Sequence, residues 1–377
     1  MENFIFPDWD NNILNISASL AEYLGVECSN YSKLQVLQNE LKKEYKNVAF
    51  ILLDGMGYNL LNRHLDSSKL LTKNIVKKLT STFPSTTTNA TTSLATLTYP
   101  GEHNWLGWCL YFDDFNRSID LFLNKDSDTE EVVENFDTYS YMPTTNYFER
   151  ERTRKDIDIY TVCPPYFRQK YDLHALSYTS LDEMFTNLDI ALKIDSKKFI
   201  YCYCNNPDHT MHDFGASSSE ANSMLSYLNE KIEQLINDNE DTLLVITADH
   251  GHIDAKGQIE FYSDEKLNSL LTRPLTLDAR SISFSVKEGK KEEFEREFSK
   301  YEKYFTLFST QYLLDKNVFG PYTEKTKNFL GDYIAVGKEN NYVGLMRENY
   351  PIMNGHHTSL TEEEMYVPLI LVKNKKD

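Results

Sequence analysis

Residues 48–57 read VAFILLDGMG, in which six consecutive apolar residues run into Asp54 and two glycines. A short apolar run without polar alternation predicts a strand that is buried on both faces of a sheet. Residues 219–237 instead show the single apolar face of a helix. Four further largely apolar runs lie at residues 157–162, 199–204, 243–247 and 366–372. Buried strands separated by helices predict an α/β fold, with a mostly parallel central sheet and helices on both of its faces.

The chain divides by pattern into two parts. Residues 1–255 and 349–377 carry the buried-strand runs, and we expect them to form the α/β core. Residues 256–348 read differently, because residues 281–287 alternate like a half-exposed strand and a charged helix with an aromatic stripe follows. We expect a small α+β insertion there, a cap domain, with further strands at 305–310, 333–336 and 342–346. Residues 109–150 hold few apolar residues and many Asp, Asn and Tyr, and we expect loops there.

Composition excludes several classes of protein. The formal net charge is −18, from 39 Lys and Arg against 57 Asp and Glu, which argues against general binding to nucleic acids or anionic membranes. No apolar run approaches the roughly 20 residues that cross a bilayer. The first residues, MENFIFPDWDNN, do not resemble a secretory signal. Five cysteines without CxxC spacing are typical of free thiols in a reducing compartment, so we expect a cytoplasmic protein.

Residue types that bind metal ions lie beside four of the predicted strands. They are Asp54 after the first run, Asp208 and His212 after residues 199–204, Asp249 and His250 after residues 243–247, and the pair His356 and His357 before the last run. The carboxyl ends of parallel strands meet at one edge of the sheet, so these side chains can converge. Carboxylate and neutral imidazole at this density favour Zn²⁺, with Mn²⁺ or Fe as alternatives.

Each piece also has a purely structural interpretation. Asp54 with its glycine is compatible with a strand-ending turn, and Asp208 with His212 is compatible with a solvated loop pair. A charge at Asp249, at the end of a buried strand, must instead be paired or ligated. Together the four pieces favour a metal centre.

Residues 81–92 form a hydroxyl-rich segment, in which eight of twelve residues are Ser or Thr ahead of a predicted helix. One interpretation is a helix N-cap cluster, since hydroxyl groups satisfy free backbone N–H groups there. The other is a hydroxyl nucleophile at a helix N-terminus, where N–H groups and the helix dipole also hold an anion. A metal ion beside the hydroxyl would lower its pKa. The chain contains no GxSxG, Walker A or GxGxxG sequence.

Six segments together carry a family resemblance. They are residues 52–57 (LLDGMG), 83–93 (FPSTTTNATTS), 99–107 (YPGEHNWLG), 207–215 (PDHTMHDFG), 247–251 (TADHG) and 355–371 (GHHTSLTEEEMYVPLIL). Their order resembles the alkaline phosphatase superfamily, and most closely its type I phosphodiesterase/nucleotide pyrophosphatase branch in the bacterial cytoplasmic form. The segments span most of the chain, so the resemblance implies the fold of that superfamily for the core.

The resemblance implies a centre of two divalent metal ions, usually zinc, with a Thr or Ser nucleophile. Counting back from Tyr99-Pro100 places the nucleophile at Thr87, with Thr86 as the nearest competitor. The implied metal ligands are Asp208, His212 and His357 for one ion, and Asp54, Thr87, Asp249 and His250 for the other. In the implied reaction Thr87 attacks phosphorus, and water then hydrolyses a phosphothreonine intermediate.

The sequence departs from the family pattern at the residue that contacts phosphate. The family places an Asn three residues after the nucleophile, where this chain has Ala90, and Asn89 comes one position early. Either Asn89 binds the substrate in its place or the substrate contacts differ from those of the nucleotide-cleaving members.

The remaining histidines are assigned by their position. His357 is favoured over His356 as the ligand because it lies three residues before Leu360, as the ligand does in relatives ending HGGLT. His252 is expected to support the ligands rather than bind metal, and His103 to fix a turn.

The implied function is a phosphodiesterase or nucleotide pyrophosphatase that acts on a small phosphate ester, with a nucleotide among the candidates. A phosphomonoesterase or a phosphonate hydrolase of the same superfamily is the alternative. Sulfatase activity is not expected, because no C/S-x-P-x-R motif surrounds Thr87. A protein of another class, a metal-stabilised binding protein without turnover, is the remaining interpretation, and Ala90 is the feature that favours it.

Overall fold

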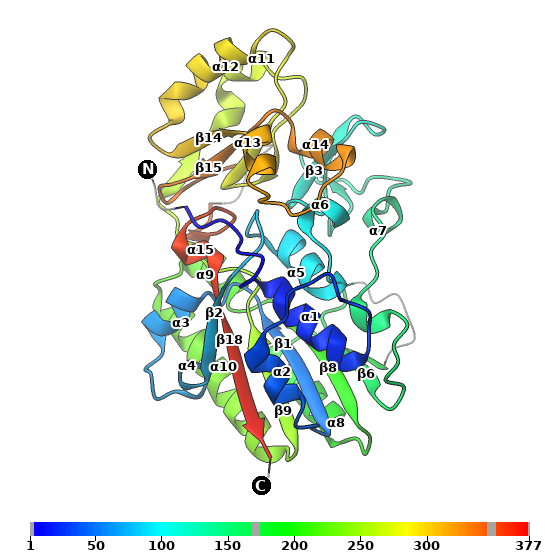
Figure 1. The fold of residues 1–377 in the computed structure, drawn as a ribbon. Helices are drawn as coiled ribbons and strands as arrows, with labels where there is room; N and C mark the ends of the chain where they lie inside the picture. The colour runs from blue at the N-terminus through cyan, green and yellow to red at the C-terminus, as the bar shows by residue number, and fades with distance from the viewer. Residues whose placement is uncertain (1–3, 168–173, 345–351, 376–377) are drawn as a thin grey trace.

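Two seven-stranded sheets lie one above the other within residues 4–167, 174–344 and 352–375, the residues that this computed structural model describes (Figure 1). The lower sheet and its helices form the core of the molecule. The upper sheet covers the end of the core from which the loops after β1, β8 and β9 emerge.

The lower sheet has the strand order β2-β18-β9-β1-β8-β6-β7. Its strands are β1 (Asn47–Leu53), β2 (Ile75–Thr80), β6 (Asp158–Cys163), β7 (His174–Ser177), β8 (Lys198–Cys204), β9 (Thr242–Thr247) and β18 (Tyr366–Asn374). β1 pairs in parallel with β8 and β9, and β6 pairs in parallel with β8 and β7, whereas β18 runs antiparallel to β9 and β2. The five strands predicted from apolar runs are all present, and the mostly parallel central sheet is confirmed.

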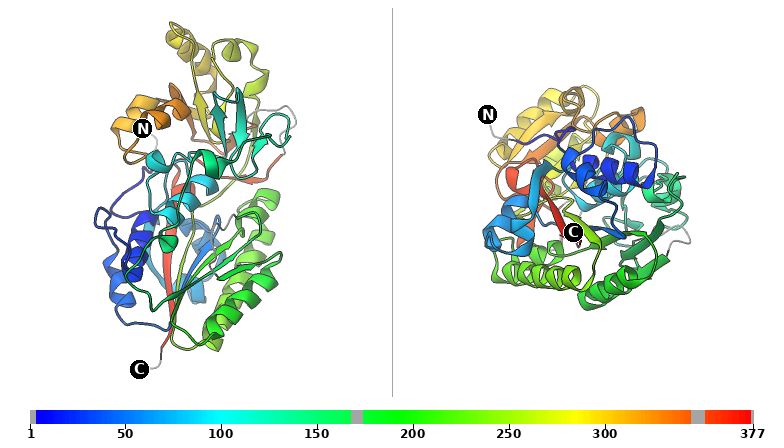
Figure 2. Two further views of the ribbon diagram at one scale, coloured as in Figure 1. Left: turned by 90° about the vertical axis from the view of Figure 1, so that its right-hand side faces the viewer. Right: turned by 60° about the horizontal axis from the view of Figure 1, so that its bottom comes forward.

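Helices cover both faces of the lower sheet (Figure 2). α1 (Ile13–Leu24) lies on one face, while α8 (Leu181–Lys193) and α10 (Ser219–Asp238) lie on the other. Every residue of β1, β8 and β9 is buried, as expected for strands covered on both sides. α10 matches the helix predicted at residues 219–237, and its N-cap is Ser218, whose side chain accepts from the Ala221 N–H.

Shorter helices connect these elements. In the core they are α2 (Gln35–Leu41), α3 (Tyr58–His64), α4 (Leu70–Lys73), α5 (Thr87–Thr96), α6 (Pro100–His103), α7 (Thr138–Tyr141), α9 (Asp208–Phe214) and α15 (Glu362–Met365). Around the upper sheet they are α11 (Glu265–Ser269), α12 (Lys291–Phe298), α13 (Thr310–Asp315) and α14 (Glu324–Leu330). Two short ribbons complete the fold, β10 (Ile253–Asp254) with β17 (Gly355–His356), and β11 (Gly257–Ile259) with β16 (Asn341–Val343).

The upper sheet is assembled from two separate parts of the chain. Its order is β14-β15-β13-β12-β3-β4-β5. The strands are β3 (Cys109–Phe112), β4 (Arg117–Asp120), β5 (Lys125–Asp126), β12 (Thr276–Asp278), β13 (Ser281–Phe284), β14 (Phe305–Ser309) and β15 (Tyr333–Gly337). The expectation of loops from residue 109 onward is therefore wrong for residues 109–126. Polar residues such as Arg117 and Asp120 interrupt this segment, while Leu110, Phe112 and Ile119 pack into the cluster around Trp105.

Strands predicted at 281–287, 305–310 and 333–336 correspond to β13, β14 and β15. Of the strand predicted at 342–346, residues 342 and 343 lie in β16, while residues 345 and 346 fall outside the described residues. The division between insertion and core at 348/349 also falls outside them, so the domain boundaries stay a prediction.

A buried ion pair joins the upper sheet to the core. Arg280, between β12 and β13, donates from Nε to Glu364 Oε1 at 2.8 Å, and both side chains are fully buried. The Arg280 backbone N–H donates to Thr358 Oγ1 at 3.0 Å, which ties the same turn to the residue after His357. Among the described residues, no helix combines the length and apolar character that crossing a bilayer requires.

Candidate active site

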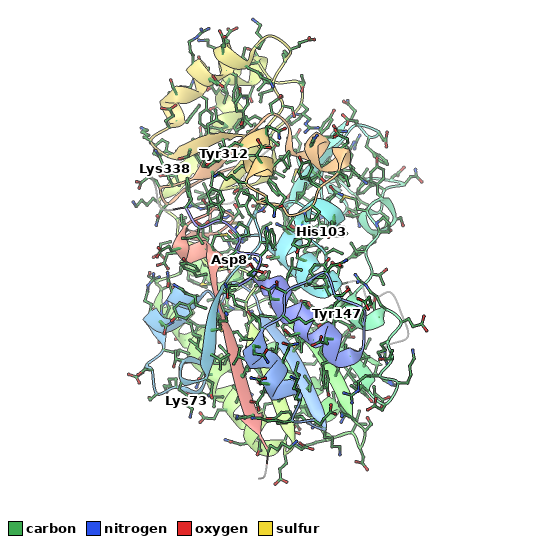
Figure 3. The ribbon with its side chains drawn as sticks, viewed as in Figure 1. Asp8, Lys73, His103, Tyr147, Tyr312 and Lys338 are labelled. Atoms are coloured by element: carbon green, nitrogen blue, oxygen red, sulfur yellow. The ribbon has the colours of Figure 1, made fainter. Side chains whose placement is uncertain are left out.

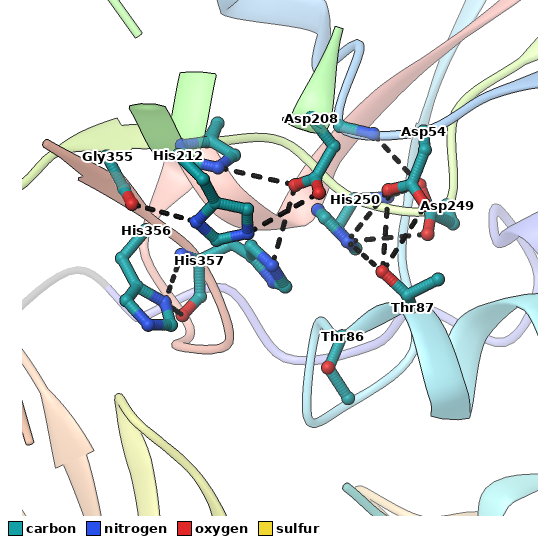
Figure 4. Close-up of polar contacts among 12 residues, drawn as sticks. Asp54, Thr86, Thr87, Asp208, His212, Asp249, His250, Gly355, His356 and His357 are labelled. Carbon is teal, nitrogen blue, oxygen red and sulfur yellow. Dashed lines mark hydrogen bonds and ion pairs between the residues drawn. The ribbon is translucent and has the colours of Figure 1, made fainter. Parts of the chain in front are cut away.

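The predicted site residues gather where the loops after β1, β8 and β9 meet the segment after β17 and the start of α5 (Figure 4). Asp54 follows β1 directly. Its backbone N–H donates to Cys204 O at 2.9 Å, and its carbonyl accepts from the Asp208 N–H at 3.0 Å. These two bonds hold the loops after β1 and β8 together.

Gly55 makes this close approach possible. Its φ is +74°, and a Cβ placed on it would lie 2.9 Å from Asp208 Cβ. Any side chain here would therefore push the Asp54 and Asp208 loops apart, in a backbone conformation that L residues rarely adopt.

Asp249 and His250 follow β9 and are fully buried. Asp249 Oδ1 accepts from the Gly55 N–H at 3.1 Å and from the His250 N–H at 3.0 Å. Asp249 Oδ2 has no hydrogen-bond partner and lies 3.3 Å from His250 Nε2. The free oxygen thus faces the same space as Asp54, whose Oδ1 is also 3.3 Å from His250 Nε2.

The neighbouring hydroxyls of Thr86 and Thr87 face different partners. Thr87 is the first residue of α5, and its Oγ1 lies 3.3 Å from Asp54 Oδ2 and 3.2 Å from His250 Nε2. Thr86 Oγ1 instead donates to Asp278 Oδ2, on β12, at 2.7 Å. Only the Thr87 hydroxyl of this pair therefore reaches the carboxylate and imidazole cluster.

A second cluster forms around Asp208 at the start of α9. His212 follows one turn later, and its Nε2 is 3.4 Å from Asp208 Oδ2. Asp208 Oδ1 lies 3.5 Å from His357 Nε2 and 3.3 Å from His252 Nε2. The structure therefore brings together Asp208, His212 and His357, and it adds His252 to them.

The hydrogen bonds of the histidines orient their rings. His212 Nδ1 lies 3.0 Å from Gly355 O, His357 Nδ1 lies 3.0 Å from Ser85 O, and His250 Nδ1 lies 2.9 Å from Gly251 O. An Nδ1–H that donates to a carbonyl leaves a lone pair on Nε2, which is the usual arrangement of a metal-binding histidine. His356 differs, because its Nδ1 accepts from the His357 backbone N–H at 3.0 Å as well as lying 3.2 Å from His357 O.

The burial of several carboxylates creates an electrostatic problem that a cation would solve. Burial raises the pKa of the Asp54 carboxyl well above its usual range, and Asp249 and Asp208 add to the rise, while a hydrogen bond from Tyr203 opposes it. Burial also raises the pKa of Asp249. Such carboxylates stay ionised together only when positive charge lies between them.

Burial and neighbouring charges in the second cluster favour the metal-binding forms of Asp208, His252 and His357. Burial alone would raise the pKa of Asp208, but the imidazoles of His212, His252 and His357 outweigh it and hold that pKa well below its usual range. Burial lowers the pKa of His357 and of His252, which favours neutral imidazole. An ionised carboxylate beside neutral imidazoles is a zinc-type donor set.

The donor set fits divalent cations on geometric grounds as well. Asp208, His212, His252 and His357 offer ligand atoms that all lie within 4.8 Å of one another, and so do Asp54, Asp208 and His250. Asp208 Oδ1 and Asp249 Oδ2 are buried without hydrogen-bond partners. Buried unpaired carboxylate oxygens are costly, and coordination to a cation would satisfy them.

Two predicted residues lie away from these clusters. Asn89 is fully buried, and its Nδ2 donates to Pro84 O at 2.8 Å, so its role in binding substrate stays a prediction. His103 is the last residue of α6 and lies near the level where the two sheets meet (Figure 3). The Trp105 N–H donates to His103 Nδ1 at 2.9 Å, and Ser93 Oγ lies 2.8 Å from Nε2, so His103 fixes a turn as expected.

Two residues that support the site, Tyr203 and Asp278, were not predicted from the sequence. Tyr203, in β8, donates from its hydroxyl to Asp54 Oδ2. Asp278 accepts from Thr86 and is buried, and burial raises its pKa to about 6. Tyr203 lies inside an apolar run and gave no signal beyond core packing. Asp278 comes from the upper sheet, whose approach to the site is a tertiary contact.

Comparisons with known proteins identify the family and the fold. The sequence model of the family described as type I phosphodiesterase / nucleotide pyrophosphatase matches residues 48–360. The fold is similar to that of murine ectonucleotide pyrophosphatase / phosphodiesterase 5, with a TM-score of 0.62 at 17% identity over 87% of this chain and 88% of that chain. An inactive variant of the murine protein, in complex with AMP, matches with the same TM-score of 0.62 and 17% identity over 87% of this chain and 91% of that chain.

The fold is also similar to that of phosphonoacetate hydrolase from Sinorhizobium meliloti 1021 in complex with phosphonoformate. The TM-score is 0.61 at 14% identity, over 87% of this chain and 90% of that chain. No curated protein matches the sequence.

Proposed function

This chain belongs to the type I phosphodiesterase/nucleotide pyrophosphatase family of the alkaline phosphatase superfamily and is therefore a phosphoric ester hydrolase. We propose that it cleaves small phosphodiesters and that Thr87 is the nucleophile. One observation carries the proposal. Thr87 Oγ1, at the first turn of α5, lies 3.2 Å from His250 Nε2 and 3.3 Å from Asp54 Oδ2, within reach of whatever those two residues bind.

We assign the residues to two metal ions, which we take to be Zn²⁺, with Mn²⁺ as the alternative. The sets are Asp208, His212 and His357 for one ion, and Asp54, Thr87, Asp249 and His250 for the other. When bound, divalent cations lower the pKa of a neighbouring hydroxyl and offset the negative charge of the transferring phosphoryl group. The buried, unpartnered oxygens of Asp208 and Asp249 support this assignment.

The chain's own groups then position the reaction. Thr87 Oγ1 gives its proton to solvent and attacks phosphorus. A bond from Thr87 to phosphorus forms, the bond to the leaving alkoxide breaks, and the alkoxide takes a proton from solvent. The Thr86 side chain does not cap the first turn of α5, so the backbone N–H groups of that turn are placed to receive phosphoryl oxygens.

Water completes the reaction. Its oxygen attacks the same phosphorus, the bond to Thr87 breaks, and Thr87 regains its proton. With a monoester the intermediate is phosphothreonine, and with a diester it keeps the second ester group.

Among the described residues, the arginine beside the His357 segment adds no positive charge for a monoester, which supports diesters as substrates. A monoester carries an additional negative charge, and enzymes that cleave it tend to add a positive group. Arg280, beside the His357 segment, is bound to Glu364 and donates to the carbonyls of Glu339 and Asn341 at 2.7 Å and 2.6 Å. With its guanidinium engaged in this way, Arg280 does not supply the additional charge.

We also propose that the upper sheet acts as a cap over the leaving-group side of the site. Its β12 contacts the nucleophile loop directly, through the hydrogen bond from Thr86 Oγ1 to Asp278. An Asp278→Ala variant should then change the relative rates on two diesters with different leaving groups, and equal losses on both would contradict this role.

The function is tested by rates on bis-p-nitrophenyl phosphate, p-nitrophenyl phosphate, phosphonoacetate and the p-nitrophenyl ester of thymidine 5′-monophosphate, after loading with Zn²⁺ or Mn²⁺. We expect the diesters to react fastest. Preference for the monoester or the phosphonate would replace the phosphodiesterase assignment with the corresponding hydrolase.

The nucleophile is tested in the same assay. Thr87→Ala should lose at least about 1000-fold in kcat with metal still bound. Thr86→Ala, the matched control, loses a hydroxyl that contacts Asp278 and should keep activity within about tenfold. Equal losses in the two variants would contradict the assignment of Thr87.

A further inference from the structure

His252 faces His357 across the short ribbon formed by β10 and β17. The two strands pair antiparallel, with Ile253 opposite His356 and Asp254 opposite Gly355. The next position outward in this register places His252 opposite His357. Side chains at opposite positions of an antiparallel pair lie on the same side. The two rings accordingly lie with their centroids 5.3 Å apart.

Gly355 leaves the space that the His252 ring occupies. A Cβ placed on Gly355 would lie 2.8 Å from His252 Cε1 and 2.9 Å from its Nδ1. The carbonyl of the same glycine lies 3.0 Å from His212 Nδ1. The ribbon therefore directs both His252 and His212 toward Asp208.

Two buried atoms at the centre of this arrangement lack hydrogen-bond partners. His252 is fully buried, and neither its Nε2 nor Asp208 Oδ1 forms a hydrogen bond. The two atoms nevertheless lie 3.3 Å apart. Unsatisfied buried polar atoms are unfavourable, and a shared cation would satisfy both atoms at once.

The distances around Asp208 match those between ligands of one tetrahedral ion. Zinc bonds of about 2.0–2.1 Å place the ligand atoms roughly 3.3–3.4 Å apart. Asp208 Oδ1 lies 3.3 Å from His252 Nε2 and 3.5 Å from His357 Nε2, and Asp208 Oδ2 lies 3.4 Å from His212 Nε2. His252 also resembles His212 and His357 in having Nδ1 near a backbone carbonyl, that of Ile253 at 3.3 Å.

We propose that His252 is a fourth protein ligand of the cation held by Asp208, His212 and His357. This assignment rests on the proposed function, and it replaces the expectation that His252 only supports the ligands. A set of one carboxylate and three imidazoles would retain its ion more tightly than the set that includes Thr87. Chelators should therefore remove the Asp208 ion last.

The neighbouring His356 provides a matched control. It is buried in the same cluster, with its ring centroid 5.2 Å from that of His212. His356 belongs to neither group of ligand atoms that lie within 4.8 Å of one another, although its Nε2, like that of His252, is buried without a hydrogen-bond partner. Replacement of His356 should leave both ions in place.

The test is zinc affinity in His252→Gln and His356→Gln, measured by competition with a chromogenic chelator and accompanied by circular dichroism. We expect His252→Gln to lower the affinity for one of the two zinc ions at least tenfold and to leave the affinity for the other unchanged. His356→Gln should change neither affinity by more than about threefold. Two ions of unchanged affinity in a folded His252→Gln protein would overturn the proposal.

A crystal structure of the zinc-loaded, unmodified protein decides the case where His252→Gln does not fold. His252 Nε2 within about 2.0–2.1 Å of a zinc ion supports the proposal, and His252 hydrogen-bonded to Asp208 without contact to zinc overturns it. Failure of the proposed function is recognised separately. If the unmodified protein binds no zinc, both the proposed function and the assignment of His252 are overturned. If Thr87→Ala keeps its activity, only the proposed function is overturned, and the zinc results for His252 stand.

Discussion

The rings of His250 and His357 stack with their centroids 3.8 Å apart and an interplanar angle of 12°. His250 belongs to the cluster around Asp54 and Thr87, and His357 belongs to the cluster around Asp208. The stacked pair therefore joins the two sets of ligand atoms into one rigid unit, although the residues come from segments more than a hundred positions apart.

Tyr203 is predicted to position Asp54 for metal binding. Its hydroxyl donates to Asp54 Oδ2, a bond that opposes the burial-driven rise in the pKa of Asp54. Without it that pKa rises further, so a metal ion must displace a more tightly held proton. Tyr203→Phe should lower zinc affinity about 10–100-fold, with the larger loss at pH 6 than at pH 8.

Tyr201→Phe is the matched control for this prediction. It lies two residues earlier in β8, and its hydroxyl is buried without a hydrogen-bond partner. Its zinc affinity should equal that of the unmodified protein. A loss of the same size in both variants would mean that the effect comes from packing and not from the bond to Asp54.

Gly55 is predicted to be required for activity because it has no side chain. Gly55→Ala combines the strain of a positive φ with a clash at Asp208 Cβ, so it should separate the two ligand loops and reduce kcat at least about 100-fold. Gly289→Ala separates the two effects, because Gly289 has a similar φ of +72° and nothing within 4 Å of the added Cβ. It should cost about 1–2 kcal/mol in urea unfolding and leave activity intact.

Removal of one partner of the Arg280–Glu364 ion pair is predicted to lower the free energy of unfolding more than removal of both partners. Glu364→Gln leaves a buried guanidinium without its counter-charge, and should lower the free energy of unfolding by about 3–5 kcal/mol in urea titrations. The double variant Arg280→Met with Glu364→Leu should recover part of that loss. A single variant that loses less than about 1 kcal/mol would contradict the role of this pair.

His103 is predicted to make the protein acid-sensitive. Burial lowers its pKa from 6.5 to about 3, so below pH 6.5 the unfolded chain binds a proton that the folded protein does not. The free energy of unfolding should then fall as the pH drops from 6.5 toward 3, by up to about 5 kcal/mol in total. In His103→Gln, unfolding measured between pH 7 and pH 4 should show a flatter dependence, and a slope equal to that of the unmodified protein would refute this cause.

Much of the core could be predicted because the buried strands are short apolar runs that end in charged residues. Asp54, Asp208 and Asp249 stand out for that reason, since the cost of burying a carboxylate makes its position informative. The strands within residues 109–126 were missed because they are short and the segment holds many polar residues, such as Arg117 and Asp120, so its composition resembles that of a loop.

The choice between two adjacent candidate residues could not be made from the sequence alone, because it depends on the direction of each side chain. Thr86 and Thr87 differ only in which side of the α5 start they occupy, and this directs one hydroxyl to Asp278 and the other to Asp54. His356 and His357 leave a strand on opposite sides, so one register step separates the ring that faces Asp208 from the ring that does not. Tyr203 gave no signal, because the sequence does not say which core hydroxyl meets a carboxylate.

The stereochemical course at phosphorus tests the central claim most directly. A chiral phosphorothioate diester, hydrolysed in ¹⁸O-labelled water by the metal-loaded enzyme, gives a product whose configuration reports the number of displacements. Attack by Thr87 followed by attack of water inverts the phosphorus twice, so the account predicts overall retention. Overall inversion would show that water attacks the substrate directly, and it would contradict Thr87 as the nucleophile.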